Sequence, residues 1–134
     1  MGLIRRSSHA LLAGLFISSG MDVYQNPEPR AATADPFFDR LAVVIPLEPQ
    51  ERVLLVKTNG AFQAVAGAAL ALGVMPRLAA LALAASLVPT TLGGHRFWEM
   101  EGPAVAGQRT QFLKNAAILG GLLLAASAGG RRGR

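Results

Sequence analysis

Long apolar runs separated by short polar stretches form the clearest pattern in this chain. Four runs stand out, at about residues 9–24, 53–73, 77–94 and 111–128. Each run is close to the ~20 residues that a helix needs to cross the ~30 Å hydrocarbon core of a bilayer. In the last three runs apolar residues occupy every face, which is typical of helices surrounded by lipid. Because backbone groups in lipid need internal partners, the pattern predicts an all-α polytopic membrane protein with four transmembrane helices in an antiparallel bundle.

The first run is the weakest of the four, because Ser18, Ser19 and Asp22 dilute its second half. It also resembles a cleaved signal peptide, in which Arg5 and Arg6 would precede the apolar core. Cleavage would leave three crossings, which fits the charge pattern less well. We therefore expect the first run to be retained.

The charged residues divide into two groups that alternate along the chain. All eight acids lie at the end of the first run or in the stretches before the second and fourth runs: Asp22, Glu28, Asp35, Asp39, Glu48, Glu51, Glu99 and Glu101. The remaining stretches hold basic residues and no acid: Arg5, Arg6, Arg77, Arg131, Arg132 and Arg134. Since short cytoplasmic segments are enriched in Lys and Arg, both termini are expected in the cytoplasm.

A long extracytoplasmic loop, residues 25–52, is expected between the first two crossings. Pro36 can open a helix and Pro46 can end one, so a short helix is predicted over residues 36–45. Its apolar positions fall on one face: Phe37, Leu41, Val44 and Ile45. Such a helix would lie on the membrane surface, or the loop would instead pack over the end of the bundle.

Composition supports the membrane interpretation and narrows the chemistry. Hydrophobic residues make up 51% of the chain, charged residues 16%, and the net charge is +5. Nucleic-acid binding is not expected, because the basic residues flank apolar runs and form no stripe interleaved with aromatic residues. The chain has no cysteine, which excludes disulfides, thiolate metal ligands and thiol redox chemistry of its own. Phe97 and Trp98 are expected to be aromatic anchors at the membrane interface.

Polar residues within the apolar runs are the best pointers to function, because burying them in lipid is unfavourable. In the four-crossing topology they gather in the outer half of the bundle: Asp22, Asn59, Gln63, Thr90, Thr91, His95, Lys114 and Asn115, with Ser86 nearby. Several have simpler interpretations. Lys114 can extend to the headgroups or pair with Asp22, and Asn59 and Gln63 can join helices by hydrogen bonds. No metal site is expected, since His9 and His95 fall at opposite ends.

Three stretches resemble the DoxX family of bacterial membrane proteins. They are SSGMDVYQNPEP, the long run from Asn59 to Glu99 that begins NGAFQAVAGAALALGVMPRLAAL, and QRTQFLKNAAILGGLLL. The resemblance implies a four-helix membrane protein, here expected in the inner membrane of a bacterium. Some members are linked to quinone-reducing thiosulfate oxidation, and others to membrane complexes that handle oxidative and thiol stress. Many members carry a lysine before the Asn-Pro pair. In this chain the stretch Met21–Pro27 contains the pair but no lysine.

These observations leave three functional hypotheses. The preferred one is a non-catalytic subunit or scaffold that supports a membrane-associated redox or oxidative-stress complex, because no catalytic motif occurs in the sequence. The second is a quinone-binding redox subunit or small oxidoreductase, in which the polar cluster would line the pocket. The third is an oligomeric carrier of small solutes. The expected partners are the bilayer, other membrane or extracytoplasmic redox proteins, and further copies of the chain. The sequence identifies no cofactor, and quinone is the one that the second hypothesis requires.

Overall fold

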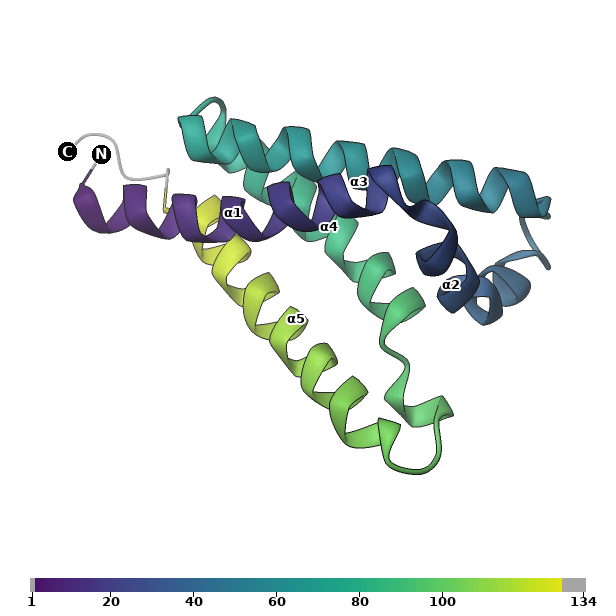
Figure 1. The fold of residues 1–134 in the computed structure, drawn as a ribbon. Coiled ribbons are helices and arrows are strands. Elements are labelled where there is room, and N and C mark those ends of the chain that lie inside the picture. Colours follow the sequence, from purple (N-terminus) through teal and green to yellow (C-terminus); the bar gives the residue numbers. More distant parts are fainter. Residues whose placement is uncertain (1, 129–134) are drawn as a thin grey trace.

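The computed structural model describes residues 2–128, and almost all of them are helical (Figure 1). In chain order the elements are α1 (Leu3–Gln25), α2 (Pro27–Leu41), α3 (Pro49–Leu72), α4 (Pro76–Gly94), the short 3-10 helix η1 (Phe97–Glu99) and α5 (Ala104–Ser127). The four apolar runs fall in α1, α3, α4 and α5. The predicted all-α class is confirmed.

Proline and glycine set several helix boundaries. Pro49 opens α3, and Glu48 and Glu51 form a reciprocal capping box there, which satisfies backbone N–H groups that the first turn leaves free. Gly73 ends α3 with a φ of 71°, a left-handed conformation that suits glycine because it has no Cβ. Pro76 then opens α4 after a turn of three residues.

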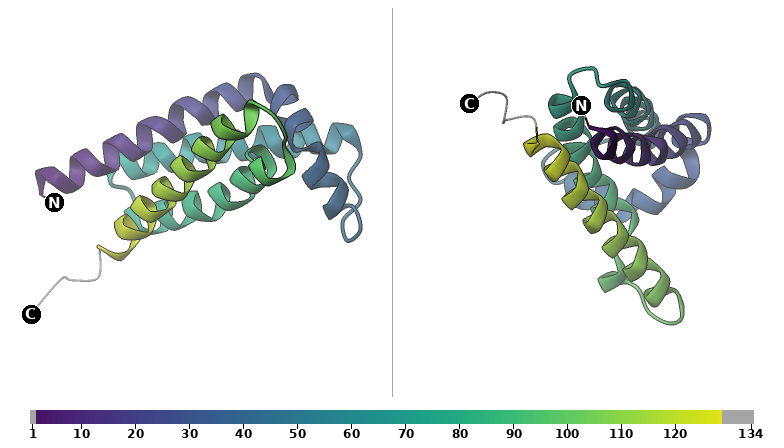
Figure 2. Two further views of the ribbon diagram at one scale, coloured as in Figure 1. Left: turned by 90° about the horizontal axis from the view of Figure 1, so that it is seen from below. Right: turned by 90° about the vertical axis from the view of Figure 1, so that its left-hand side faces the viewer.

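The helices pack as two layers that diverge. Helices α1 and α3 lie side by side and antiparallel, and α4 and α5 form a second antiparallel pair (Figures 1 and 2). Fully buried leucines from three helices join the layers: Leu70, Leu83 and Leu122. Only Leu122 and Ala126 of α5 are buried, so this helix leaves most of its surface exposed. The four long helices therefore form two antiparallel pairs that splay apart, and their crossing of a membrane stays a prediction.

The first turns of α1 and the last turn of α5 lie at the same end of the molecule. At one end, called the terminal end here, Arg5 of α1 donates to the Ala128 carbonyl at 2.8 Å, and Arg77 of α4 donates to the Ala126 carbonyl at 3.0 Å. Helix α1 therefore begins where α5 ends. The opposite end, which contains α2 and η1, is called the α2 end. Arg131, Arg132 and Arg134 lie outside the described residues.

Helix α2 occupies much of the stretch that was expected to be a long loop. It begins at Pro27 and ends at Leu41, so the helix predicted over residues 36–45 starts and ends too late. Pro36 lies inside the helix, and Pro27 takes the opening position because proline is well tolerated in the first turn. Phe38 is buried, whereas Val44 and Ile45 are exposed, so the predicted apolar face is also wrong in part. Helix α2 packs on α3 and α4 across the end of the bundle.

Within the described residues, two stretches are long and apolar enough to cross a membrane by length and composition. They are Pro49–Leu72 and Pro76–Glu99. Helix α1 carries Arg5, Arg6 and Asp22 along with several serines, and α5 carries Arg109 and Lys114. These residues lower the mean hydropathy of α1 and α5.

Candidate functional site

A buried polar network joins α3 to α4 in the half of the bundle nearer the α2 end. The Gln63 amide donates to Ser86 Oγ at 3.0 Å and to Thr90 Oγ1 at 3.3 Å. Asn59 Nδ2 donates to Thr90 Oγ1 at 3.1 Å, and Ser86 Oγ donates to Asn59 Oδ1 at 2.6 Å. Gln63 is 4% exposed and Ser86 is 7% exposed. Each of these four side chains has at least one hydrogen-bond partner within the network, as is usual for buried polar groups.

A second, smaller polar contact joins α4 to α5. Asn115 Nδ2 donates to Thr91 Oγ1 at 3.0 Å, and the Thr91 hydroxyl donates to the Leu87 carbonyl of its own helix. Successive residues of an α-helix point about 100° apart. Thr90 therefore faces α3, whereas Thr91 faces α5. The polar residues that were expected to form one cluster therefore form two clusters, on different sides of α4.

An apolar cleft of about 130 Å³ opens beside the Thr91–Asn115 contact, between α4 and α5. Its walls are mostly aliphatic, and Phe112 is its one aromatic residue. The Phe112 ring packs edge-on against Phe97 and Trp98 at centroid distances of 5.5 and 5.6 Å. Trp98 remains 50% exposed at the α2 end.

His95 lies at the junction between α4 and the loop that carries η1. Its Nδ1 is 2.8 Å from Oε1 of Gln108 on α5, so the imidazole N–H donates to the amide oxygen in the matching tautomer. This contact ties the loop to the beginning of α5. Sequence analysis selected His95 and missed Gln108.

Asp22 and Lys114 lie apart from both polar clusters. The Asp22 side chain is 64% exposed, and its nearest cation is Arg30 of α2 at 3.8 Å. Lys114 is exposed on α5. The ion pair considered between these two residues is therefore absent, and the alternative, in which Lys114 extends toward the headgroups, stays a prediction.

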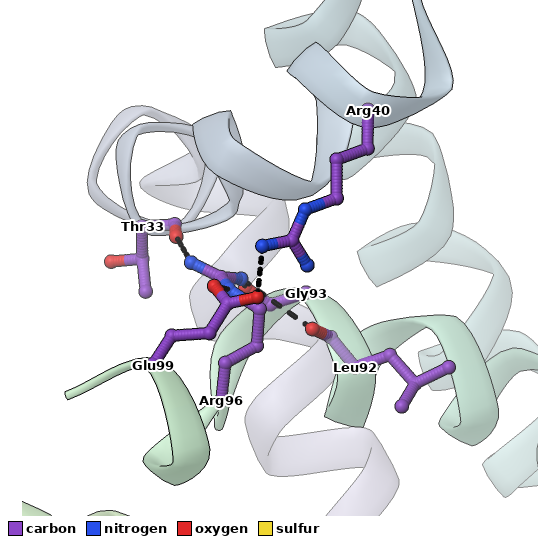
Figure 3. A network of polar contacts seen from close by, with 6 residues as sticks. All are labelled: Thr33, Arg40, Leu92, Gly93, Arg96 and Glu99. Carbon is purple, nitrogen blue, oxygen red and sulfur yellow. Dashed lines mark hydrogen bonds and ion pairs between the residues drawn. The ribbon is translucent and has the colours of Figure 1, made fainter.

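Arginine side chains hold the α2 end together (Figure 3). Arg96 donates to the Thr33 carbonyl of α2 at 2.9 Å, to Glu99 at 2.9 Å, and to carbonyls in the last turn of α4. Arg40 of α2 also pairs with Glu99. On the other side of α2, Arg52 of α3 pairs with Asp39 at 2.9 Å and with Asp35 at 3.1 Å.

Glu99 is the acid whose ionisation this network changes. Its side chain is 23% exposed. Partial burial raises the pKa of the Glu99 carboxyl, but the hydrogen bonds from Arg40 and then Arg96 outweigh that effect, so the pKa is lowered from its ordinary value. The carboxylate therefore stays charged and links the η1 loop to α2.

The terminal end contains a buried histidine that sequence analysis did not select. His9 is 3% exposed on the face of α1 that also buries Ala13 and Phe16. Neither of its ring nitrogens has a hydrogen-bond partner among the described residues. The i, i+4, i+7 spacing of these three residues is the signal that could have placed His9 on the buried face.

Hydrogen bonding is the chemistry that the two polar clusters offer. Among residues 2–128, no group of three or more His, Asp or Glu side chains lies close enough together to hold a metal ion. The α3–α4 network offers amides and hydroxyls, which bind by hydrogen bonds and are not nucleophiles without a base beside them.

Comparison with known proteins gives one match. The model of the DoxX family matches residues 9–96, about two thirds of the 134 residues. The match covers α2, α3 and α4 and most of α1, and it ends before α5. No curated protein and no solved structure matches the chain at a significant level.

Proposed function

This chain belongs to the DoxX family, and we propose that it is a non-catalytic subunit of a membrane-associated redox or oxidative-stress complex. The family and the apolar helices together indicate a membrane protein. In the proposed arrangement α1, α3, α4 and α5 all cross the inner membrane of a bacterium. The terminal end would face the cytoplasm, and α2 and η1 would lie on the outer side.

The termini and the charges support this placement. The beginning of α1 and the end of α5 share one end of the molecule, which fits an even number of crossings. Arg5, Arg6 and Arg77 occupy that end, and short basic segments are retained on the cytoplasmic side. Helices of 23 and 24 residues, as in α1 and α5, reach ~35 Å, which is enough for the hydrocarbon core.

One observation favours a structural role over a catalytic one. The polar groups of Asn59, Gln63, Ser86 and Thr90 bond to one another between α3 and α4. These hydrogen bonds hold α3 and α4 together, which is the usual role of amides and hydroxyls in membrane bundles. A substrate would have to displace these bonds before it could use the same atoms.

The α2 end offers the surface for a partner. Arg52 and Arg96 hold α2 in place, and the turn that follows it exposes Val43 (88%) and Val44 (79%). Trp98 is half exposed at the same end. A rigid surface with exposed apolar and aromatic side chains is suited to binding another protein. We infer from the family resemblance that this partner is a redox or stress-response protein.

Site-specific photo-crosslinking from native membranes tests this proposal. We expect a photoreactive amino acid at Val43 to crosslink to a discrete protein, and mass spectrometry to identify that protein as a redox or thiol-handling enzyme. Leu72, which is 79% exposed at the other end of α3, is the matched control and should crosslink to lipid. Crosslinks to lipid alone from both positions would contradict the proposal.

The cleft between α4 and α5 favours a second candidate, a quinone-binding subunit. The cleft has apolar walls, and the Thr91–Asn115 contact supplies polar groups that could bind a carbonyl oxygen. Trp98 is the only tryptophan in the chain, and it packs on Phe112 in the wall of the cleft. Quenching of its fluorescence by a short-chain quinone therefore reports occupancy. Quenching that is equal in wild type and Asn115→Leu would remove this candidate.

A further inference from the structure

His9 is a buried polar side chain that has no hydrogen-bond partner among residues 2–128, where the other buried polar side chains are paired. Gln63, Ser86 and Thr91 all have hydrogen bonds, whereas both nitrogens of His9 lack them within residues 2–128. An unsatisfied donor and acceptor in an apolar environment are unfavourable. The imidazole therefore indicates that a group other than residues 2–128 supplies a hydrogen bond here.

A groove beside His9 gives such a group a place to bind. The groove measures about 750 Å³ and lies between the first half of α1 and the last turns of α5. Its walls are largely aliphatic: Ile4, Leu11, Leu12 and Leu124. His9 lines the groove together with Ser8 and Arg5. Apolar walls next to a few polar groups suit a molecule with a long hydrocarbon part and a polar head.

The basic residues at this end indicate that the polar head of the bound molecule is negatively charged. Arg5 uses one nitrogen to bind the Ala128 carbonyl and keeps further N–H groups for another acceptor. Arg6 is exposed at the next position, and Arg77 lies at the same end. None of the eight acids of the chain lies at this end. Basic groups beside an apolar groove attract the phosphate of an acidic lipid.

We propose that this groove binds one acidic phospholipid. Its phosphate would accept hydrogen bonds from Arg5, and one acyl chain would lie along Leu12 and Leu124. The His9 imidazole would turn about its side-chain bonds toward the groove that it lines and donate to an ester or headgroup oxygen. The inference rests on the proposed membrane placement, in which this end meets the headgroups of the inner leaflet.

Native mass spectrometry of protein released from defined vesicles tests the site. The vesicles contain phosphatidylglycerol and phosphatidylcholine in equal amounts, and wild type is expected to retain one phosphatidylglycerol per chain. His9→Leu keeps the volume of the side chain and removes its polar atoms, so we expect about tenfold weaker retention. Arg109→Ala is the control, because it removes an exposed arginine from the part of α5 near the α2 end.

Arg5→Ala should also weaken retention about tenfold, whereas Arg5→Lys, which keeps the charge, should retain most of it. If Arg5→Ala fails to fold, His9→Leu and Arg5→Lys still decide the question. Undiminished retention by His9→Leu, or equal retention of the two lipids, would overturn the proposal.

Inorganic phosphate distinguishes a lipid site from a simple anion site. We expect millimolar phosphate neither to displace the lipid nor to raise the melting temperature of delipidated protein. A shift equal to that produced by phosphatidylglycerol would show an anion site only and would also overturn the proposal. Loss of the lipid site would leave the partner crosslinks from Val43 unchanged, so the two proposals can fail separately.

Discussion

Gly20 of α1 and Gly60 of α3 lie in direct backbone contact where the two helices cross. A methyl group at Gly20 would lie 2.5 Å from the Gly60 carbonyl oxygen, and one at Gly60 would lie 2.8 Å from the Gly20 carbonyl oxygen. Both distances are too short for a carbon atom beside a backbone oxygen. The close packing of α1 on α3 therefore depends on glycine at both positions, and small residues play the same role where membrane helices pack closely.

Gly20→Ala is expected to destabilise the protein by ~1–3 kcal/mol, because the added methyl group forces the two backbones apart. Thermal unfolding in a mild detergent measures the effect. Gly120→Ala is the matched control, since nothing lies within 4 Å of a methyl group at that position of α5. Equal stability of the two variants would show that α1 does not pack on α3 in this way.

Gln63 and Ser86 should be energetically coupled. A double-mutant cycle of Gln63→Leu and Ser86→Ala is expected to give ~0.6 kcal/mol of coupling, the usual value for a hydrogen bond between membrane helices. Gln63→Leu and Thr91→Val should be additive, because Thr91 bonds to Asn115 on the other side of α4. Coupling of similar size in both cycles would indicate one connected cluster instead of two.

Glu99 should make the stability of the α2 end depend on pH. Its folded pKa is lowered, so the charged carboxylate contributes stability that is fully present above the unfolded pKa of ~4.3. That contribution is lost as the pH falls through the folded pKa. Hydrogen exchange of α2, measured from neutral pH into the acid range after correction for the intrinsic rate, should show this loss in wild type.

Glu99→Gln should have weaker protection of α2 at neutral pH and a smaller change on acidification. Glu101→Gln is the control, since Glu101 is exposed and keeps the network intact. A pH response of Glu99→Gln as large as that of wild type would mean that the contacts of Glu99 with Arg40 and Arg96 do not hold α2.

The proposed topology can be read by cysteine labelling, because the natural chain has no cysteine. We expect Val43→Cys to react with a membrane-impermeant maleimide in spheroplasts, and Leu3→Cys to react only after the membrane is permeabilised. Val43 and Leu3 are both highly exposed, at 88% and 80%. A difference in labelling between the two cysteines would therefore be due to the membrane and not to burial within the protein. Labelling of both sites in intact spheroplasts would contradict a cytoplasmic terminal end.

Several features of the fold follow from the sequence alone. The apolar runs identify α1, α3, α4 and α5, because helix formation in an apolar segment is a local property of the backbone. Pro49 and Gly73 bracket α3 for equally local reasons. Helix α2 was harder to delimit, since Pro27 and Pro36 can both open a helix and only packing against α3 and α4 decided between them.

The tertiary structure alone decided which polar side chains meet. The sequence placed Asn59, Thr90, Thr91 and Asn115 at similar depths, and depth is set by counting residues along each helix. Which neighbour each side chain faces depends on the rotation and crossing of whole helices, and these follow from long-range contacts such as Gly20 against Gly60. That is why Thr90 and Thr91 belong to different clusters, and why His9 is enclosed at the end where α1 meets α5.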